Sequence, residues 1–229
     1  MENKRMRSVN ITLKDMLERM DRPRPVLVAR PIRNPNHPKK GSRIKVEPIH
    51  KLEDIELIRK RLAGQPRDLL LFTLGINTNL RASDIVALAI GQVRYLKPLE
   101  DLEIRERKTG KLRRISINQS VITAIAGYLV TLPDGTSDSA PLFASQRGDR
   151  ALSVPSVHRL VKGWCREIKL KGNYGSHTLR KTWGYHQRVT FGVDLPALMV
   201  CFNHSHQRQT LDYLCVQSEE IKRIYAHEL

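Results

Sequence analysis

The 229-residue chain has few cysteines, few aromatic residues and no long apolar run. Its three cysteines follow no framework spacing, which is typical of proteins in a reducing cytosol. No apolar run approaches the roughly 20 residues that span a bilayer, and residues 1–10 lack the apolar stretch of a secretion signal. We therefore expect a cytoplasmic protein that makes no membrane contact.

Basic residues, by contrast, are abundant. The chain has 40 Lys and Arg against 23 Asp and Glu, a formal net charge of +17. Such an excess predicts a polyanionic partner, and favours nucleic acid over a membrane surface or a ribosomal site. Because only 5% of the residues are aromatic, we expect contacts from Lys and Arg to phosphates rather than base stacking, and a strong salt dependence.

The basic excess is greatest at the N-terminus. Residues 1–51 hold 14 Lys or Arg against 5 Asp or Glu, a net charge of +9. A short helix is expected near residues 10–20, but residues 21–46 are rich in proline, which disfavours regular helix. We interpret residues 1–47 as a basic arm or linker, either a solvated tail or a segment that orders on DNA. Its expected DNA contacts are Lys39, Lys40 and Arg43.

Residues 48–229 are expected to form one domain, mainly α with a small antiparallel β-sheet (α+β). Helical periodicity is found near residues 51–62, 66–76, 81–90, 119–132, 153–170, 177–189, 195–202 and 218–229. Alternation in residues 104–108 and 112–117, around Thr109-Gly110, predicts a β-hairpin. Further DNA contacts are expected from Lys111, Arg113 and Arg114 on this hairpin and from Lys181.

Residues suited to phosphate chemistry recur along this domain. Arg81 lies in "NTNLRASDIVAL", Lys108 in the hairpin "ERKTGKLRR", and His177 and Arg180 in "SHTLRKTW", where they share one helical face. "FNHSHQRQTLDYL" contains His204 and, nine residues later, Tyr213. Each motif alone is weak, but their order is specific.

In order and local sequence, these motifs resemble the catalytic domain of the tyrosine recombinase (phage integrase) family over about residues 48–216. The resemblance implies a site-specific recombinase or integrase that acts on double-stranded DNA. Such an enzyme cleaves a strand by tyrosine attack, leaving a 3′-phosphotyrosyl bond and a free 5′-hydroxyl, and it needs no metal and no cofactor. It also implies four protomers on DNA during exchange, with a monomer allowed when free.

The resemblance also assigns roles to individual residues. Tyr213 would be the nucleophile and His177 its base or hydrogen-bonding partner. Arg81 and Arg180 would bind the non-bridging phosphate oxygens, and His204 would donate a hydrogen bond to the phosphate. Lys108 would be the general acid, with Lys111 as the competing residue. Asp84 would either steady the active-site side chains or act only as a carboxylate near a helix N-terminus.

The chain departs from the family pattern at two glycines and upstream of the domain. Asn79 and Asn203 occupy positions that are usually glycine, and asparagine is the next residue most tolerant of left-handed backbone. Only about 50 residues precede the domain where many members have a helical core-binding domain. A solitary catalytic domain or a fragment is therefore expected.

Other interpretations remain open. Cys201, His204 and His206 have metal-ligand character, although they lack the paired spacing of structural zinc sites. The chain could instead be a catalytically silent DNA-binding protein, a type IB topoisomerase-like enzyme or a helix-turn-helix regulator. The segment 218–229, with Ile221, Ile224 and Tyr225 on one face, would either dock on a neighbouring protomer or pack on its own domain.

Overall fold

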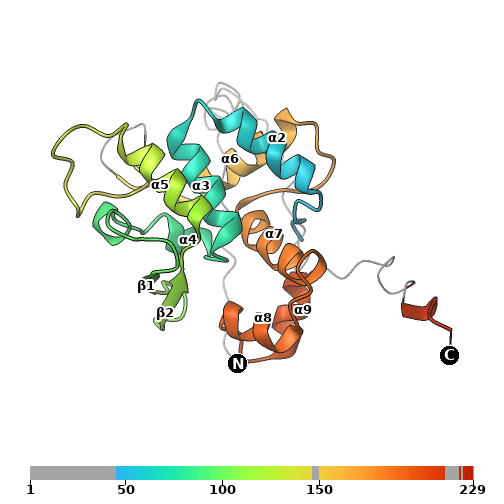
Figure 1. Ribbon diagram of the computed structural model, residues 1–229. Coiled ribbons are helices and arrows are strands. Elements are labelled where there is room, and N and C mark those ends of the chain that lie inside the picture. The colour runs from blue at the N-terminus through green and yellow to red at the C-terminus, as the bar shows by residue number, and fades with distance from the viewer. Residues whose placement is uncertain (1–44, 146–149, 215–221, 223, 229) are drawn as a thin grey trace, which may run out of the picture. The chain divides into compact units, whose positions relative to one another are not determined.

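The computed structural model describes residues 45–145, 150–214, 222 and 224–228 (Figure 1). Nearly all of the expected basic arm and its expected helix therefore lie outside the described residues, as do Lys39, Lys40 and Arg43. The same holds for most of the segment 218–229. In the part that is described, no helix is long and apolar enough to cross a membrane.

The described chain is mainly helical, with one two-stranded antiparallel sheet, which confirms the expected fold class (Figure 1). Its elements in order are α2 (Leu52–Leu62), α3 (Pro66–Asn77), α4 (Ala82–Ile85), the 3-10 turn η1 (Ile90–Gln92), β1 (Asp101–Arg105), β2 (Leu112–Ser116), α5 (Gln119–Leu129), α6 (Val154–Glu167), α7 (Ser176–Val189), α8 (Leu195–Phe202) and α9 (Gln207–Leu214). One expectation was wrong, because the helix expected at 81–90 is a single turn. One element, α9, was not expected.

Local sequence sets the starts of several helices. Pro66 occupies the first turn of α3, where its missing N–H costs nothing. Asn118, Ser153 and Asp194 cap α5, α6 and α8, each accepting a hydrogen bond from a backbone N–H of the first turn. These caps satisfy N–H groups that have no partner within a helix.

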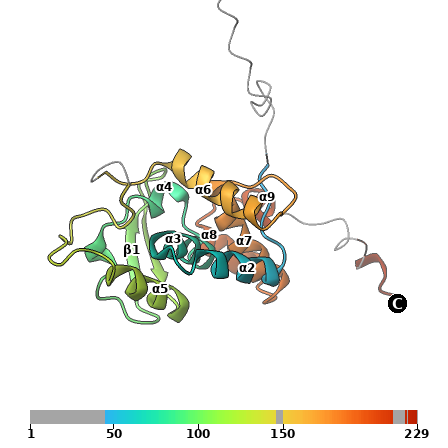
Figure 2. The same ribbon diagram turned by 90° about the horizontal axis from the view of Figure 1, so that it is seen from above.

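Helix α3 lies between α5 and α7 in both views, and it packs against each of them (Figures 1 and 2). The approach to α7 is close, because a Cβ built on Gly75 would lie 2.5 Å from Leu179 Cδ1. Leu70, Leu71 and Phe72 of α3 are fully buried in the main core. The helix is therefore apolar nearly all round, as its sequence predicted.

A second, smaller core lies at the C-terminal end of the described chain. Leu198 and Phe202 of α8 and Leu214 of α9 are fully buried there and pack against Trp183 of α7. Gly184 of α7 lets Phe202 approach, since a Cβ at this position would lie 2.6 Å from the Phe202 ring. This small core holds α8 and α9 against the helix that carries His177 and Arg180.

The chain entering the domain is fastened to α7. The Ile49 N–H donates to Thr182 Oγ1 (2.9 Å), and the Ile49 carbonyl lies 2.9 Å from His186 Nε2. Just before it, the Glu47 N–H donates to the carbonyl of Asn173 (2.8 Å). The segment that leads out of the basic arm is thus held on the same helix that supplies two of the motif residues.

Candidate active site

The six motif residues lie on or beside α4, α7, α8 and α9 and on the hairpin. Arg81 precedes α4, Lys108 is in the hairpin, His177 and Arg180 are on α7, His204 follows α8 and Tyr213 is on α9. Residues distant in sequence meet because α7 packs against α3 on one side and against α8 and α9 on the other.

Asn79 directs the chain from α3 towards Arg81. Its φ of 47° is left-handed, and it follows the end of α3 at Asn77. The turn places Leu80 in the core and Arg81 at the start of α4, so that the Arg81 side chain is 13% exposed. The tolerance of asparagine for this backbone region therefore preserves the turn.

Arg180 is the most buried of these cations, at 1% exposure. Its Nη1 donates to the Asn79 carbonyl and its Nη2 to the Phe202 carbonyl (3.0 Å), while Nε has no hydrogen-bond partner among the described residues. Burial first, and then the charges of Arg81 and Arg113, lower the pKa of Arg180 to about 9. It is still charged at neutral pH, with one buried donor unused.

Arg81 is held by two carboxylates. Its Nη1 lies 2.8 Å from Glu106 Oε2 and 3.9 Å from Asp84 Oδ2. Arg81 Nη1 is thus paired with charge, whereas Arg180 Nε has no hydrogen-bond acceptor among the described residues. Asp84 also accepts the Arg107 N–H (3.0 Å), which joins α4 to the hairpin.

The hairpin carries Lys108 at its exposed tip. Strands β1 and β2 pair in a register that sets Leu102 opposite Ile115 and Ile104 opposite Arg113. Lys108 and Lys111 are both exposed, and neither side chain forms a hydrogen bond or ion pair with the rest of the described chain. Burial contributes most to lowering the pKa of His177, and the charge of Lys108 adds to it.

Asn203 ends α8 and turns the chain into the His204 segment. It is left-handed (φ 54°, ψ 43°), and the His204 N–H behind it donates to the Met199 carbonyl (3.1 Å). This is the usual way in which a left-handed residue closes a helix. Asn79 and Asn203 thus both adopt the left-handed backbone conformation that glycine would supply.

His204 lies in an aromatic and cationic setting. Its ring stacks on Phe202 (5.1 Å, 9°), and its Nδ1 lies 3.1 Å from the hydroxyl of buried Thr210. Burial first, and then the charges of Arg180 and Arg81, lower its pKa to about 4. His204 is therefore neutral at pH 7, and a hydroxyl that donates to Nδ1 leaves the proton on Nε2.

Tyr213 comes to the same place from α9. Its hydroxyl lies 3.4 Å from His177 Nδ1, a loose hydrogen bond, and the Arg180 guanidinium lies 5.4 Å from the centre of its ring. Although His177 is exposed as a residue, desolvation of its ring, followed by the charges of Arg180 and Lys181, lowers its pKa. His177 is thus a neutral base in contact with a phenol.

Two of the residues expected to contact DNA, Arg113 and Lys181, are buried in this structure. Arg113 is 9% exposed and points inward, where it donates to Glu106 Oε1 (3.2 Å), to the Cys201 carbonyl (2.6 Å) and to Asn79 Oδ1. Lys181 is 7% exposed and also lies inside. Lys111 and Arg114 are on the surface as expected, and Arg114 forms an ion pair with Glu103 (2.5 Å).

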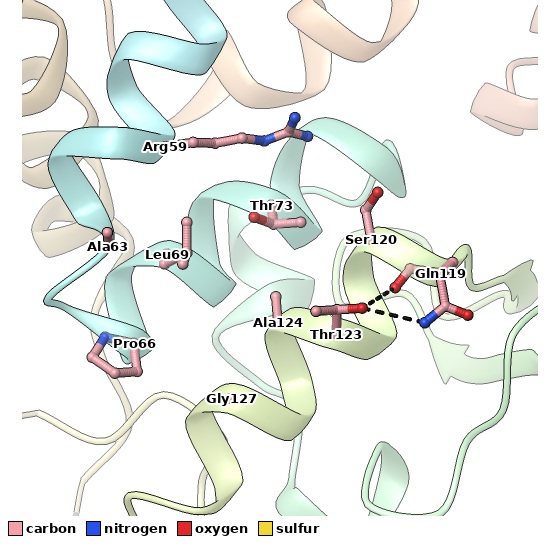
Figure 3. Close-up of a pocket in the computed structure, with 10 residues that line it drawn as sticks. All are labelled: Arg59, Ala63, Pro66, Leu69, Thr73, Gln119, Ser120, Thr123, Ala124 and Gly127. Atoms are coloured by element: carbon pink, nitrogen blue, oxygen red, sulfur yellow. Dashed lines mark hydrogen bonds between the residues drawn. The ribbon is translucent and has the colours of Figure 1, made fainter.

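The motif residues neither form a metal cluster nor line the apolar groove of Figure 3. Within the described ranges, no group of three His, Cys, Asp or Glu side chains is arranged to hold a metal. Cys201 and His206 are exposed, and Cys215 lies outside those ranges. An open groove of about 570 Å³ lies between α2, α3 and α5 and is lined by none of the motif residues (Figure 3).

The sequence motifs missed three residues that contact the site, namely Asn79 through its side chain, Glu106 and Thr210. A signal existed for Glu106, since the alternation of Leu102 and Ile104 continues to it and places it on the buried face. A buried carboxylate needs a charged partner, so the pattern pointed to an ion pair.

Comparisons with known proteins agree with this geometry. The sequence pattern described as "Phage integrase family" matches residues 51–220. The chain is 33% identical to "Probable integrase/recombinase YoeC" of Bacillus subtilis (strain 168) over 183 residues, which are 79% of this chain and 95% of that protein. It is 30% identical to "Tyrosine recombinase XerC" of Caldanaerobacter subterraneus subsp. tengcongensis, over 83% of this chain but only 54% of the relative.

Solved structures show the same fold at lower identity. XerA recombinase matches with a TM-score of 0.63 and 16% identity, over 82% of this chain and 65% of that one. XerH bound to palindromic difH substrate, in a post-cleavage complex, matches with a TM-score of 0.65 and 18% identity, over 80% and 53%. The match of the family pattern over most of the chain and the identity to YoeC show that the chain belongs to the phage integrase family, the tyrosine recombinases.

Proposed function

We propose that this protein cleaves and rejoins double-stranded DNA at specific sites through a 3′-phosphotyrosyl bond to Tyr213. The observation that carries the proposal is the meeting of a tyrosine, a neutral histidine, a buried arginine and a second, partly buried arginine in one chain. Tyr213 Oη lies 3.4 Å from His177 Nδ1, Arg180 Nε is a buried donor without a hydrogen-bond acceptor among the described residues, and Arg81 is close enough for its charge to act on Arg180. A phosphodiester supplies the acceptor oxygens that such donors require.

In the proposed reaction, the two arginines bind the non-bridging oxygens, whose charge increases in the transition state. Arg180 is rigid because two of its nitrogens are fastened to backbone carbonyls. A site that is ordered before the substrate arrives does not have to reorganise during the reaction. His204, held by Thr210, donates its Nε2–H to the same phosphate.

Proton transfer involves two further residues. The phenol of Tyr213 must lose a proton to attack, and neutral His177 receives it. The departing O5′ must gain a proton, which Lys108 donates from the hairpin tip. We assign this role to Lys108 rather than Lys111, because the charge of Lys108 acts on His177.

The partner chemistry follows from charge and from relatives. The net charge of +17 and the exposed Lys111 and Arg114 favour phosphate contacts along a duplex, and XerH is described as bound to its DNA substrate. We propose that residues 1–47 form a DNA-binding arm and that residues 48–229 form the catalytic domain. We also propose that four protomers act together during exchange, which the mass of the protein–DNA complex in sedimentation would establish or refute.

The nucleophile can be tested directly. Wild-type protein, incubated with cognate DNA that carries a nick beside the scissile bond, should form a covalent adduct that survives SDS. Tyr213→Phe should form none, because it lacks the attacking oxygen. Tyr95→Phe is the matched control, since Tyr95 is 76% exposed and belongs to none of the motifs. An adduct formed by the Tyr213→Phe protein would contradict the proposal and direct attention to Tyr185 or Tyr225.

A further inference from the structure

Glu106 is a buried carboxylate that precedes Lys108 by two residues. It is 1% exposed, and its side chain is wholly inaccessible. It continues the inward face of β1 after Leu102 and Ile104, so a charged group occupies a position that the strand pattern gives to an apolar one. A carboxylate is retained at such a position only where its partners offset the cost of burial.

The partners of Glu106 come from three different parts of the site. Oε2 lies 2.8 Å from Arg81 Nη1 and accepts a hydrogen bond from Thr109 Oγ1 at 2.7 Å. Oε1 accepts a hydrogen bond from Arg113 Nη1 at 3.2 Å. One carboxylate thus contacts an arginine of the phosphate clamp, the tip of the hairpin and the opposing strand.

The backbone of Glu106 also closes the hairpin turn. Its N–H donates to the Lys111 carbonyl (2.9 Å), and its carbonyl accepts from the Gly110 N–H (2.8 Å). Gly110 has a φ of 69°, which fits the tight turn. On the side facing α4, the Arg107 N–H donates to Asp84 Oδ1. Lys108 therefore lies between Arg107 and Thr109, each fastened to a buried carboxylate.

Glu106 is ionised at neutral pH. Burial acts to raise its pKa, but the contacts with Thr109 and Arg81, the charge of Arg81 and the hydrogen bond from Arg113 together hold the pKa below its ordinary value of 4.5. The carboxylate therefore attracts Arg81 and Arg113 and accepts the Thr109 hydroxyl at once.

We propose that Glu106 is a positioning residue that couples the phosphate clamp to the hairpin lysine, so that Arg81 and Lys108 are set by the same carboxylate. The inference rests on the proposed function, because it takes Arg81 as a phosphate ligand and Lys108 as the general acid. The inference adds a residue that fixes the positions of Arg81 and Lys108 relative to each other.

The effect of Glu106 on Arg81 and its effect on Lys108 can be measured separately. In the proposed cleavage, the bond from Tyr213 Oη to phosphorus forms and the bond from phosphorus to O5′ breaks. The phenol proton passes to His177, and O5′ takes a proton from the Lys108 ammonium. If sulfur replaces O5′, a thiolate leaves without a proton, since thiols have pKa values of about 8.5. Such DNA needs the phosphate clamp but not the acid.

The test compares single-turnover adduct formation on oxygen DNA and on DNA with a 5′-bridging phosphorothiolate, at saturating DNA. General acid catalysis contributes about 10²–10⁴-fold, so Lys108→Ala should lose at least about 100-fold on oxygen DNA and recover most of it on sulfur DNA. Glu106→Gln should lose about 100-fold on oxygen DNA and only about tenfold on sulfur DNA, the remainder reflecting Arg81. Equal deficits on the two DNAs, or no deficit on either, would overturn the proposal.

This comparison is insensitive to misfolding, because a smaller active fraction lowers both rates by the same factor. Thr109→Val provides a second variant at an exposed residue: it removes the hydroxyl that donates to Glu106 at 2.7 Å and that also accepts the Lys111 N–H at 3.3 Å. It should show a smaller loss with the same recovery on sulfur DNA, and wild-type rates on both DNAs would count against the coupling. Glu103→Gln, which removes an exposed carboxylate paired with Arg114 on the same hairpin, is the matched control and should cleave normally.

The outcome also distinguishes the inference from the proposed function. A wild-type protein that forms no SDS-stable adduct on either DNA contradicts the function itself. A wild-type protein that forms the adduct, together with a Glu106→Gln protein whose deficit is the same on oxygen and sulfur, contradicts only the coupling.

Discussion

Asn79→Gly and Asn203→Gly are the same substitution at two left-handed positions, yet the structure predicts different results. Both residues have φ near 50°, so glycine relieves the same backbone strain at each. It also gives the unfolded chain the same added freedom, and the two effects are of similar size, about 0.4–1 kcal/mol each. What differs between the two positions is the side chain.

The Asn79 side chain is buried, and both its amide nitrogen and its amide oxygen form hydrogen bonds. The residue is 2% exposed, its Nδ2 donates to the Cys201 carbonyl (2.9 Å), and its Oδ1 accepts from Arg113 Nη2. A neutral hydrogen bond contributes about 1 kcal/mol and one to a charged group about 1.5–3 kcal/mol. Arg113 keeps its contacts with Glu106 and Cys201, which recovers part of the loss. We expect Asn79→Gly to reduce the free energy of unfolding by about 2–3 kcal/mol.

Asn203→Gly should leave stability within about 0.5 kcal/mol of wild type, since strain relief and unfolded-state entropy offset each other. The Asn203 side chain forms no hydrogen bond with any other described residue, while its backbone closes α8 in a form that glycine adopts freely. Urea denaturation followed by circular dichroism would measure both variants. For a domain of this size, the Asn79 variant should melt about 5–10 °C lower. Equal losses at the two positions would refute the reasoning.

Three further predictions concern His204 and His177. Thr210→Val removes the hydroxyl that lies 3.1 Å from His204 Nδ1, and should slow adduct formation about 5–10-fold by freeing the other tautomer. The same change in a His204→Ala background should cost nothing further, and additive losses would contradict the link. Because the pKa values of His177 and His204 are lowered, adduct formation should stay constant from pH 8 down to pH 6.5, and a decline centred at or above pH 6.5 would contradict a neutral His177 base. His204 should also make the folded state less stable as pH falls from 6.5 towards about 4, because only the unfolded chain binds its proton there; urea titrations across that range measure this loss.

The motifs identified His177, Arg180, His204 and Tyr213, whose side chains lie near one another in the structure. The spacing of apolar residues predicted α3 and α7, and the alternation around Thr109-Gly110 predicted the hairpin. These succeeded because helix and strand periodicities are local, and because α3, α7 and the hairpin each follow them. The two asparagines were also interpretable, since few residues other than glycine accept a left-handed backbone.

Helix α9 escaped prediction because its stability does not come from its own sequence. Its first turn, Gln207-Arg208-Gln209, is polar and exposed, and no N-terminal cap or long apolar stripe marks it. It is held by buried Thr210 and Leu214, which pack against α7 and α8. The placement of Tyr213 is thus a tertiary effect, in which a residue is positioned by helices from elsewhere in the chain.

The burial of Arg113 was not expected from the sequence, for a related reason. Within β2, Leu112 and Arg114 are exposed while Arg113 points inward, so the strand places its apolar residue outside and a charge inside. The sequence of one strand does not show that Glu106, beyond the end of the other strand, supplies the buried countercharge. The basic run "KLRR" alone indicates an exposed basic surface, but pairing across the hairpin turns Arg113 inward to Glu106.

The same pairing bears on how a strongly basic protein assembles a phosphate site. Burial and the charge of Arg81 lower the pKa of Arg113, and burial and the charges of Arg81 and Arg113 lower the pKa of Arg180. Two buried carboxylates, Asp84 and Glu106, lie among these arginines and offset part of their charge. Because Arg113 shares Glu106 with Arg81, neither arginine is fully neutralised by it, and Arg81 retains charge for the substrate. Neutralising Arg113 would therefore tighten Glu106 on Arg81 and weaken phosphate binding, although Arg113 itself is buried away from the DNA.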